Sequence, residues 1–188
     1  IHKKGQYLND EKEGVWKTYT REGRLASIEH FENGEETSTD SLYSEANVLE
    51  TTIDYKSGER HGWLTQYGAK NELMYMLHYI DNLIVGYTYQ GADGSFVKEI
   101  PVENSEKLVP LNAFYKDGKR SLEGYYQNGT YQGKRTLYYP NDKVYYEVSY
   151  KDGKSDGDEK EFYPNGQLNY VHHYQDGELV GLQQKYND

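Results

Sequence analysis

The sequence has no cysteine, only four prolines and two tryptophans, and no long apolar run. Without cysteine, disulfides, thiolate metal sites and cysteine nucleophiles are excluded. The lack of an apolar stretch of about 18 residues argues against a membrane-spanning helix. Acidic residues outnumber basic ones by 31 to 21, giving a formal net charge of −10. This balance disfavours nucleic acid as a partner and favours a basic protein.

Aliphatic residues are also scarce, and a chain this polar often cannot bury enough apolar surface to fold. The 22 tyrosines and 19 glycines, set against four prolines, argue against disorder. A tyrosine ring supplies buried area while its hydroxyl stays in water. We therefore expect a thin core built largely from aromatic rings.

Glycines recur with a period of 24 residues, as the intervals 62–86, 133–157 and 157–181 show. Ser38 takes the place of glycine at one start, and Val109 absorbs a one-residue deletion. The whole chain, 1–188, is then a single repeat array in which 86–108 is irregular. Its parts are a half-repeat 1–13, units starting at residues 14, 38, 62, 86, 109, 133 and 157, and a half-repeat 181–188.

Aligned on these starts, the repeats share two aromatic columns and two turn columns. Five residues after each start lie Tyr19, Tyr43, Tyr67, Gly91, Phe114, Tyr138, Phe162 and Tyr186. Seventeen residues after each start lie Phe31, Tyr55, Tyr79, Val102, Tyr126, Tyr150 and Tyr174. One turn column comprises 33–34, 57–58, 128–129, 152–153 and 176–177, and the other 22–23, 117–118, 141–142 and 165–166.

Asn-Gly and Asp-Gly pairs are strong hairpin signals, because tight hairpin turns need positive φ. Each unit therefore has two short strands. In one of them Val144, Tyr146, Val148 and Tyr150 alternate with other residues and share a face. The predicted fold class is all-β: an elongated, solenoid-like, single-layer antiparallel meander of 24-residue β-hairpin repeats, each touching only its neighbours.

The order Gly-x-x-x-x-Tyr, Asn-Gly-x-Leu, Tyr-x-Asn/Asp-Gly, Gly is cleanest over 133–181. It resembles the MORN-repeat variant found in many bacterial proteins, over nearly the whole chain. The resemblance implies a non-catalytic protein, and some such proteins are antitoxin or immunity components. We expect a protein-interaction module, of antitoxin or immunity type, that binds a basic partner protein.

A different interpretation is an exported or surface-associated module that binds glycan or cell envelope through its aromatic rows. The tyrosine content and the start at Ile1 rather than Met motivate it and favour an exported, envelope-associated bacterial protein over a cytoplasmic one. The scarcity of tryptophan argues against it, because comparable cell-wall-binding repeats are richer in that residue.

No pattern of catalytic residues is visible. The sequence has no nucleophile elbow and no phosphate-binding loop, so we predict no enzyme activity, no catalytic residue and no cofactor. His30, His78 and His173 share a column, but His30 and His78 lie two repeats apart, about 19 Å. A zinc ligand lies about 2 Å from its metal, so no metal site is predicted.

Two charged segments are candidate partner contacts. Asp156, Asp158, Glu159 and Glu161 cluster around one hairpin junction, where they are explained by a solvated acidic face or, more specifically, by a docking patch for Lys or Arg. Lys98, Glu99, Glu103 and Glu106 lie in the irregular unit, where Pro101 and Pro110 are expected to interrupt strand pairing. That unit is either a partner-contacting bulge or a tolerated bend in the array.

Overall fold

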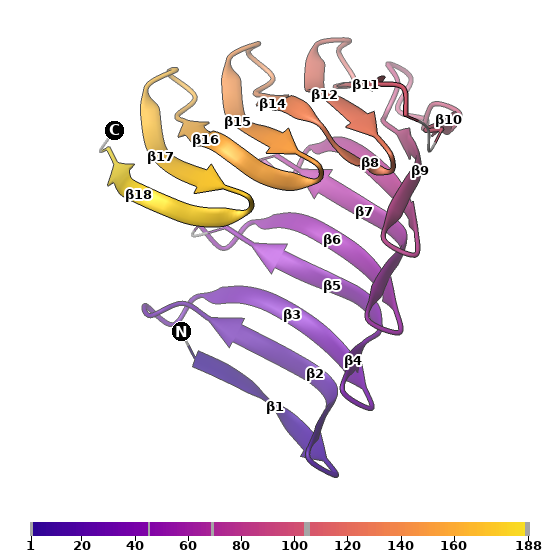
Figure 1. The fold of residues 1–188 in the computed structure, drawn as a ribbon, viewed down its shortest axis with the longest axis vertical. Coiled ribbons are helices and arrows are strands. Elements are labelled where there is room, and N and C mark those ends of the chain that lie inside the picture. Colours follow the sequence, from indigo (N-terminus) through magenta and orange to yellow (C-terminus); the bar gives the residue numbers. More distant parts are fainter. Residues whose placement is uncertain (1, 45, 69, 104–105, 187–188) are drawn as a thin grey trace. The chain divides into compact units, whose positions relative to one another are not determined.

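The computed structural model describes residues 2–44, 46–68, 70–103 and 106–186. Consecutive strands pair antiparallel along the chain (Figure 1), and no described residue is helical. The all-β meander is therefore confirmed. The strands are β1 His2–Leu8, β2 Glu11–Tyr19, β3 Leu25–Glu32, β4 Glu35–Glu36, β5 Ser38–Tyr43, β6 Leu49–Lys56, β7 Glu59–Tyr67, β8 Leu73–Ile80, β9 Leu83–Thr88, β10 Ile100–Pro101, β11 Val109–Phe114, β12 Arg120–Gln127, β13 Thr130–Tyr131, β14 Gly133–Tyr138, β15 Val144–Lys151, β16 Lys154–Phe162, β17 Leu168–Gln175 and β18 Glu178–Lys185.

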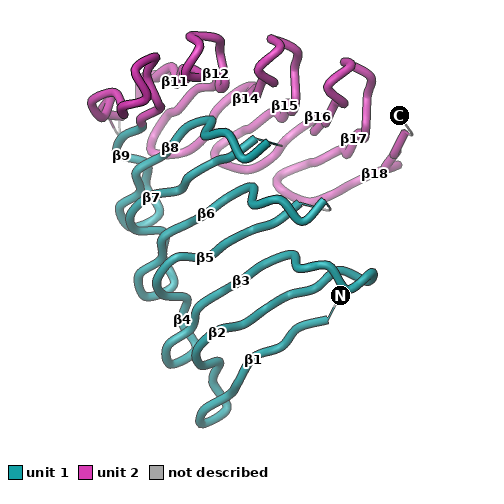
Figure 2. Tube along the Cα trace, turned by 180° about the vertical axis from the view of Figure 1, so that it is seen from behind, with its two compact units in different colours: residues 1–87 teal, residues 88–188 magenta. Residues whose placement is uncertain are grey.

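The strands form two sheets rather than one continuous sheet. β1 to β10 make the first and β11 to β18 the second, and the chain divides into compact units 1–87 and 88–188 (Figure 2). The change of sheet falls inside the irregular unit. Pro101 lies in β10, the last strand of the first sheet, and Pro110 in β11, the first strand of the second. Proline lacks an N–H and is tolerated on edge strands, so both prolines end a sheet rather than interrupt a strand.

The predicted hairpin turns form at one turn column. Asn33, Ser57, Asn128, Asp152 and Asp176 have φ near 50°, and the glycine after each has φ of 75–85°. Positive φ at both central residues defines the type I′ turn, which matches the twist of the flanking strands. Asn9-Asp10 and Asp81-Asn82 adopt the same turn without glycine.

The start positions are places where the strand register slips. The register shifts between Ile53 and Tyr55 opposite β7, and between Val148 and Tyr150 opposite β16. Gly62 and Gly157 lie at the centres of the resulting bulges on β7 and β16, with φ of 116° and 109°. Such bulges favour glycine because it alone adopts positive φ freely. Ser38, the predicted substitute for glycine, has φ 63°.

The core lies along the face that carries the column seventeen residues after each start. On β8, Tyr75, Leu77 and Tyr79 are 0%, 1% and 4% exposed, and Met74 on the other face is also buried. Tyr126 and Val148 are equally enclosed, and Val102 is buried in the irregular unit. The aromatic column five residues after each start is only half-buried where it is described, and Tyr186 is exposed. The column seventeen residues after each start therefore contributes more to the buried core than the column five residues after each start.

Candidate interaction surfaces

The four acidic residues predicted around one hairpin junction all lie on β16, but they do not share a face. Glu159 and Glu161 point with Tyr146 and Tyr170, whose backbones flank Glu161 in register. Asp158 points the other way, where it contacts His173 Nδ1 at 2.6 Å and Lys160 Nζ at 3.0 Å. The hydrogen bonds to Lys160, which has the larger effect, and to His173 lower the pKa of the Asp158 carboxyl.

The Glu159 carboxylate contacts side chains on its own face of the sheet. Its Oε1 accepts a hydrogen bond from the Tyr170 hydroxyl at 3.2 Å and lies 3.6 Å from His172 Nδ1. Burial and then the Glu159 charge raise the pKa values of the Tyr146 and Tyr170 hydroxyls. Glu161 accepts a hydrogen bond from the Asn169 side chain at 2.7 Å. This side of β16 is thus a half-buried network of tyrosines and carboxylates.

The predicted contacts in the irregular unit are more accessible. Lys98, Glu99, Glu103 and Glu106 are all exposed, whereas residues 104–105 lie outside the described chain. The Glu106 carbonyl accepts a hydrogen bond from Gln127 Nε2 at 2.6 Å. Gly91 and Gly94 form a turn, since Gly94 N donates to the Gly91 carbonyl.

The histidines of the shared column have separate surroundings. His30 Nδ1 lies 3.6 Å from Asp40, His78 stacks on Trp63 with ring centroids 4.7 Å apart, and His173 contacts Asp158. In the part of the chain that the structure describes, no group of three or more His, Asp or Glu side chains is placed to hold a metal ion.

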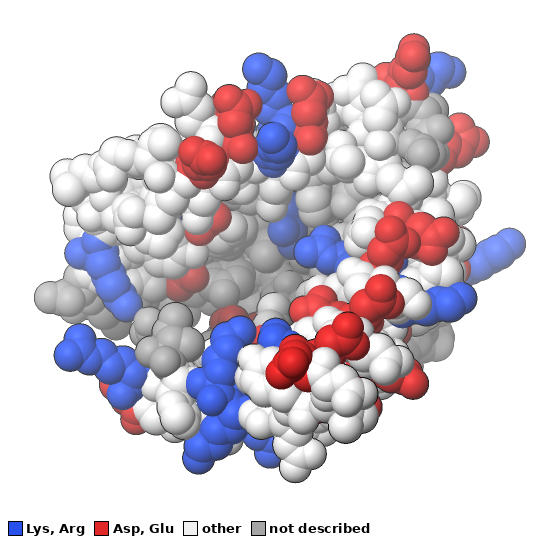
Figure 3. Space-filling view, turned by 60° about the horizontal axis from the view of Figure 1, so that its bottom comes forward, with Lys and Arg blue, Asp and Glu red and all other residues white. Residues whose placement is uncertain are grey.

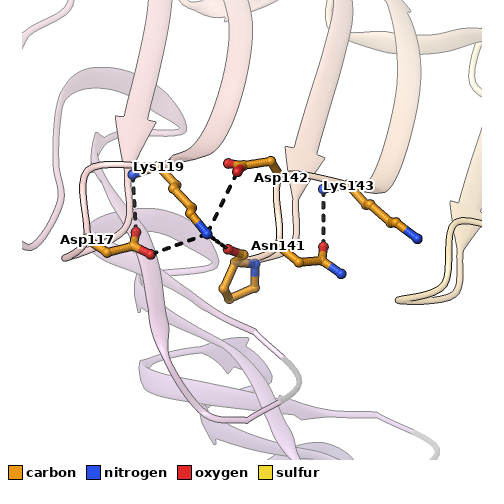
Figure 4. A network of polar contacts seen from close by, with 6 residues as sticks. Asp117, Lys119, Asn141, Asp142 and Lys143 are labelled. Carbon is orange, nitrogen blue, oxygen red and sulfur yellow. Dashed lines mark hydrogen bonds and ion pairs between the residues drawn. The ribbon is translucent and has the colours of Figure 1, made fainter.

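A ladder of contacts between turns joins each repeat of the second unit to the next. The hydroxyls of Tyr115, Tyr139 and Tyr163, spaced by 24, donate to main-chain carbonyls 23 residues further on, at 2.5, 2.7 and 3.0 Å. Lys119 Nζ donates to the Pro140 carbonyl at 2.7 Å, between the carboxylates of Asp117 and Asp142, each at 3.8 Å (Figure 4). The column of Tyr115, Tyr139 and Tyr163 was visible in the sequence but was not predicted as a structural column.

The first unit has an exposed acidic surface that sequence reasoning missed. It follows the hairpin turns β1–β2, β3–β4, β6–β7 and β8–β9, and these turns adjoin one another through main-chain bonds from Gly34, Gly58 and Asn82 to the preceding hairpin. We call this surface the acidic hairpin edge. It comprises Asp10, Glu11, Glu32, Glu35, Glu59 and Asp81, all exposed. A row of acidic side chains is visible on the face shown in Figure 3.

Basic residues lie next to this edge, with Lys56 opposite Glu59 in the strand register, but in the described chain Lys12, Lys56 and Arg60 form no ion pair with its carboxylates. Lys12 Nζ lies over the Phe31 ring, 4.0 Å from its centroid, and the Arg60 guanidinium lies over Tyr79 at 5.5 Å. Among the described residues, only Asp81 of the six carboxylates has an ion-pair partner, His61 Nδ1 at 3.0 Å. Over the whole first unit, residues 1–87, the sequence holds 15 acidic and 9 basic residues, a net charge of 9 − 15 = −6.

Comparison with family models matches three segments, residues 12–33, 131–152 and 155–176, to the MORN repeat variant. Each segment corresponds to one 24-residue unit: a strand, a turn with positive φ and the next strand. The chain contains MORN-variant repeats. Two of the three matched segments lie almost entirely in the stretch 133–181, where the predicted resemblance was cleanest. No curated protein matches the chain.

MORN repeats are in general modules that bind proteins or membranes and are typically non-catalytic. A partner contact is therefore the kind of site to seek on a chain with such repeats. Within the described residues, no helix is long and apolar enough to cross a membrane.

Proposed function

We propose that this protein is a non-catalytic MORN-variant module that binds a basic partner protein through the acidic hairpin edge of its first unit. The carrying observation is the succession of six exposed carboxylates on four adjoining turns. Adjacent turns lie two strands apart, about 10 Å. Carboxylates so arranged produce a continuous negative potential along the edge, which steers and orients a positively charged partner.

The acids of β16 support this role less well, because they divide between two faces and bind residues of their own unit. Charges already paired within a protein must lose those partners before they bind another. The carboxylates of Glu32, Glu35 and Glu59 have no such partner among the described residues.

The resemblance to antitoxin and immunity components supports a narrower proposal, in which the partner is a basic toxin that this protein holds inactive. Co-expression tests it. A toxic basic partner should lose its toxicity beside the wild-type chain and regain it beside a variant with a reversed hairpin edge.

The direct test compares two triple charge reversals. The edge variant carries Glu32→Lys, Glu35→Lys and Glu59→Lys, and the matched control carries Glu103→Lys, Glu106→Lys and Glu178→Lys. All six residues are exposed and none is at a positive-φ position. Both variants change the net charge by the same amount.

Each tagged protein is incubated with native extract at about 50 mM and about 500 mM salt, and retained proteins are identified by mass spectrometry. We expect a basic protein that is retained at low salt, is lost at high salt because exposed charges are screened, and is lost from the edge variant but not from the control. Loss from the control alone would place the contact in the irregular unit and at β18. Retention by all three proteins would refute an electrostatic contact.

A further inference from the structure

A pair of like charges occurs where the first two strands meet. Lys4 on β1 and Lys17 on β2 are directly opposed in the antiparallel register, and both side chains are exposed. Like charges directly opposite one another across a strand pair destabilise it. Neighbouring Lys3 pairs with Glu29 at 3.9 Å, but neither Lys4 nor Lys17 forms an ion pair with any described residue.

In the second unit, residues of opposite charge occupy the equivalent pair of repeat positions. The corresponding cross-strand pair on β15 and β16 is Glu147 with Lys160, and Glu147 also pairs with Lys134 at 2.5 Å. The repeat therefore does not require two lysines at these positions. Their opposition is unfavourable for the fold alone and becomes favourable when an anion lies between them.

An open cavity of about 550 Å³ lies at this place, lined by Lys4, Gly5, Gln6, Glu13, Val15, Lys17 and Tyr19. The register shifts between Lys4 and Gln6, and a side chain at Gly5 would collide with the Trp16 ring, 2.2 Å from its Cβ. The bulge is on β2, where residues 14–16 lie opposite Gly5, and the absence of a side chain at Gly5 lets β1 pass over Trp16.

The lining combines three kinds of contact. Two ammonium groups can bind an anionic oxygen group, Gln6 and Glu13 can hydrogen-bond hydroxyls, and Tyr19 with half-exposed Val15 offers an apolar patch. The Lys4 ammonium lies 5.7 Å from the centre of the Tyr19 ring, which brings the cation beside the aromatic surface. The volume lies in the range of small-ligand sites and exceeds what a bare phosphate or carboxylate fills.

We propose that this cavity binds an acidic saccharide, with the carboxylate of the sugar between Lys4 and Lys17 and the sugar ring against Tyr19 and Val15. The site lies on β1 and β2. It is separate from a protein contact at the acidic hairpin edge, because none of its lining residues, Glu13 included, belongs to that edge or is changed in the charge-reversal variants.

The test uses the full chain, isotope-labelled for NMR, with trigalacturonate, a hyaluronan tetrasaccharide and 3′-sialyllactose as probes. Neutral oligosaccharides of matched length and inorganic phosphate serve as ligand controls. We expect at least one acidic probe to shift the signals of Lys4, Lys17 and Tyr19 saturably. Its neutral counterpart and phosphate should bind at least ten-fold more weakly.

Lys17→Glu restores an opposite-charge pair with Lys4, so it should raise the melting temperature while abolishing binding. Loss of binding in a more stable protein cannot be caused by unfolding. The reciprocal variant Lys160→Glu opposes two carboxylates in the second unit, and it should lower the melting temperature and leave binding unchanged.

Several results would overturn the proposal. One is that no acidic probe shifts the three signals, and another is that neutral and acidic probes bind equally. Phosphate binding as tightly as the best saccharide would reduce the site to a simple anion contact. An unchanged or lower melting temperature for Lys17→Glu would remove the repulsion on which the inference rests.

Discussion

Replacing Asp40 by asparagine should abolish a pH dependence of stability that this one carboxyl imposes. Asp40 is 4% exposed on β5, and its Oδ1 accepts a hydrogen bond from the His30 main-chain N–H at 2.9 Å. Burial raises its pKa to about 6 from 3.8, and Glu36 adds to the rise, while the His30 N–H opposes it. Asparagine can accept the same hydrogen bond without a charge.

The sign follows from proton linkage. Because the folded protein holds this proton more tightly than the unfolded chain, Asp40 contributes stability fully below pH 3.8 and loses it as the pH rises through about 6. The difference between 3.8 and 6 corresponds to about 3 kcal/mol. The advantage of Asp40→Asn over wild type should therefore grow from near zero at pH 4 to about 3 kcal/mol at pH 7.5.

Urea unfolding monitored by tryptophan fluorescence measures this difference at each pH. His30, Glu36 and Tyr55 surround the carboxyl, so the comparison is repeated in a His30→Gln background to remove the imidazole. A difference between Asp40→Asn and wild type that does not change with pH in either background would refute the reasoning.

Four further substitutions test the packing of the second unit, each by urea denaturation. Tyr126→Ala, at a side chain 2% exposed, should destabilise by about 3–4 kcal/mol, and Tyr125→Ala, on the opposite face and 37% exposed, by less than about 1 kcal/mol; equal losses would contradict the assigned core face. Gly153→Ala should destabilise by more than about 1 kcal/mol, because φ is 79° and the new Cβ would lie 2.9 Å from the Thr130 Cβ; an unchanged midpoint would contradict the turn geometry. Tyr139→Phe should lose about 1 kcal/mol with its 2.7 Å bond to the next repeat; full stability would mean that the turn ladder contributes nothing.

The regular parts of the fold could be predicted because they repeat. Among the residues that the structure describes, thirteen other than glycine have positive φ, and those in the predicted turn column, such as Asn33 and Asp152, carry the residue types that such turns require. Ser38 was identified as a start from its position alone, and the structure gives it the backbone conformation of the glycines it replaces. A spacing shared by several repeats therefore predicts the backbone conformation even where one repeat carries an unusual residue type.

The surfaces were harder to predict, because exposed residues are not constrained to repeat. Asp158 and Glu159 looked like one cluster in the sequence, yet strand alternation sends them to opposite faces. Glu32 and Glu59 are 27 residues apart and belong to different columns, but the turns bring them to one edge. The change of sheet was also missed, since Pro101 and Pro110 were interpreted as interruptions rather than as residues of edge strands.

The turn ladder also restricts how such a chain can change length. If a whole unit of 24 residues were duplicated or deleted, the hydroxyls of Tyr115, Tyr139 and Tyr163 would still lie opposite main-chain carbonyls of the following turns. The gain or loss of one residue within a repeat would displace one hydroxyl from its carbonyl, and within a paired strand it would turn the side chains that follow in that strand toward the other face. The unit shortened by one residue is also the place where one sheet ends and another begins. In this protein a gain or loss of whole repeats is a change of length, whereas the loss of one residue is a change of architecture.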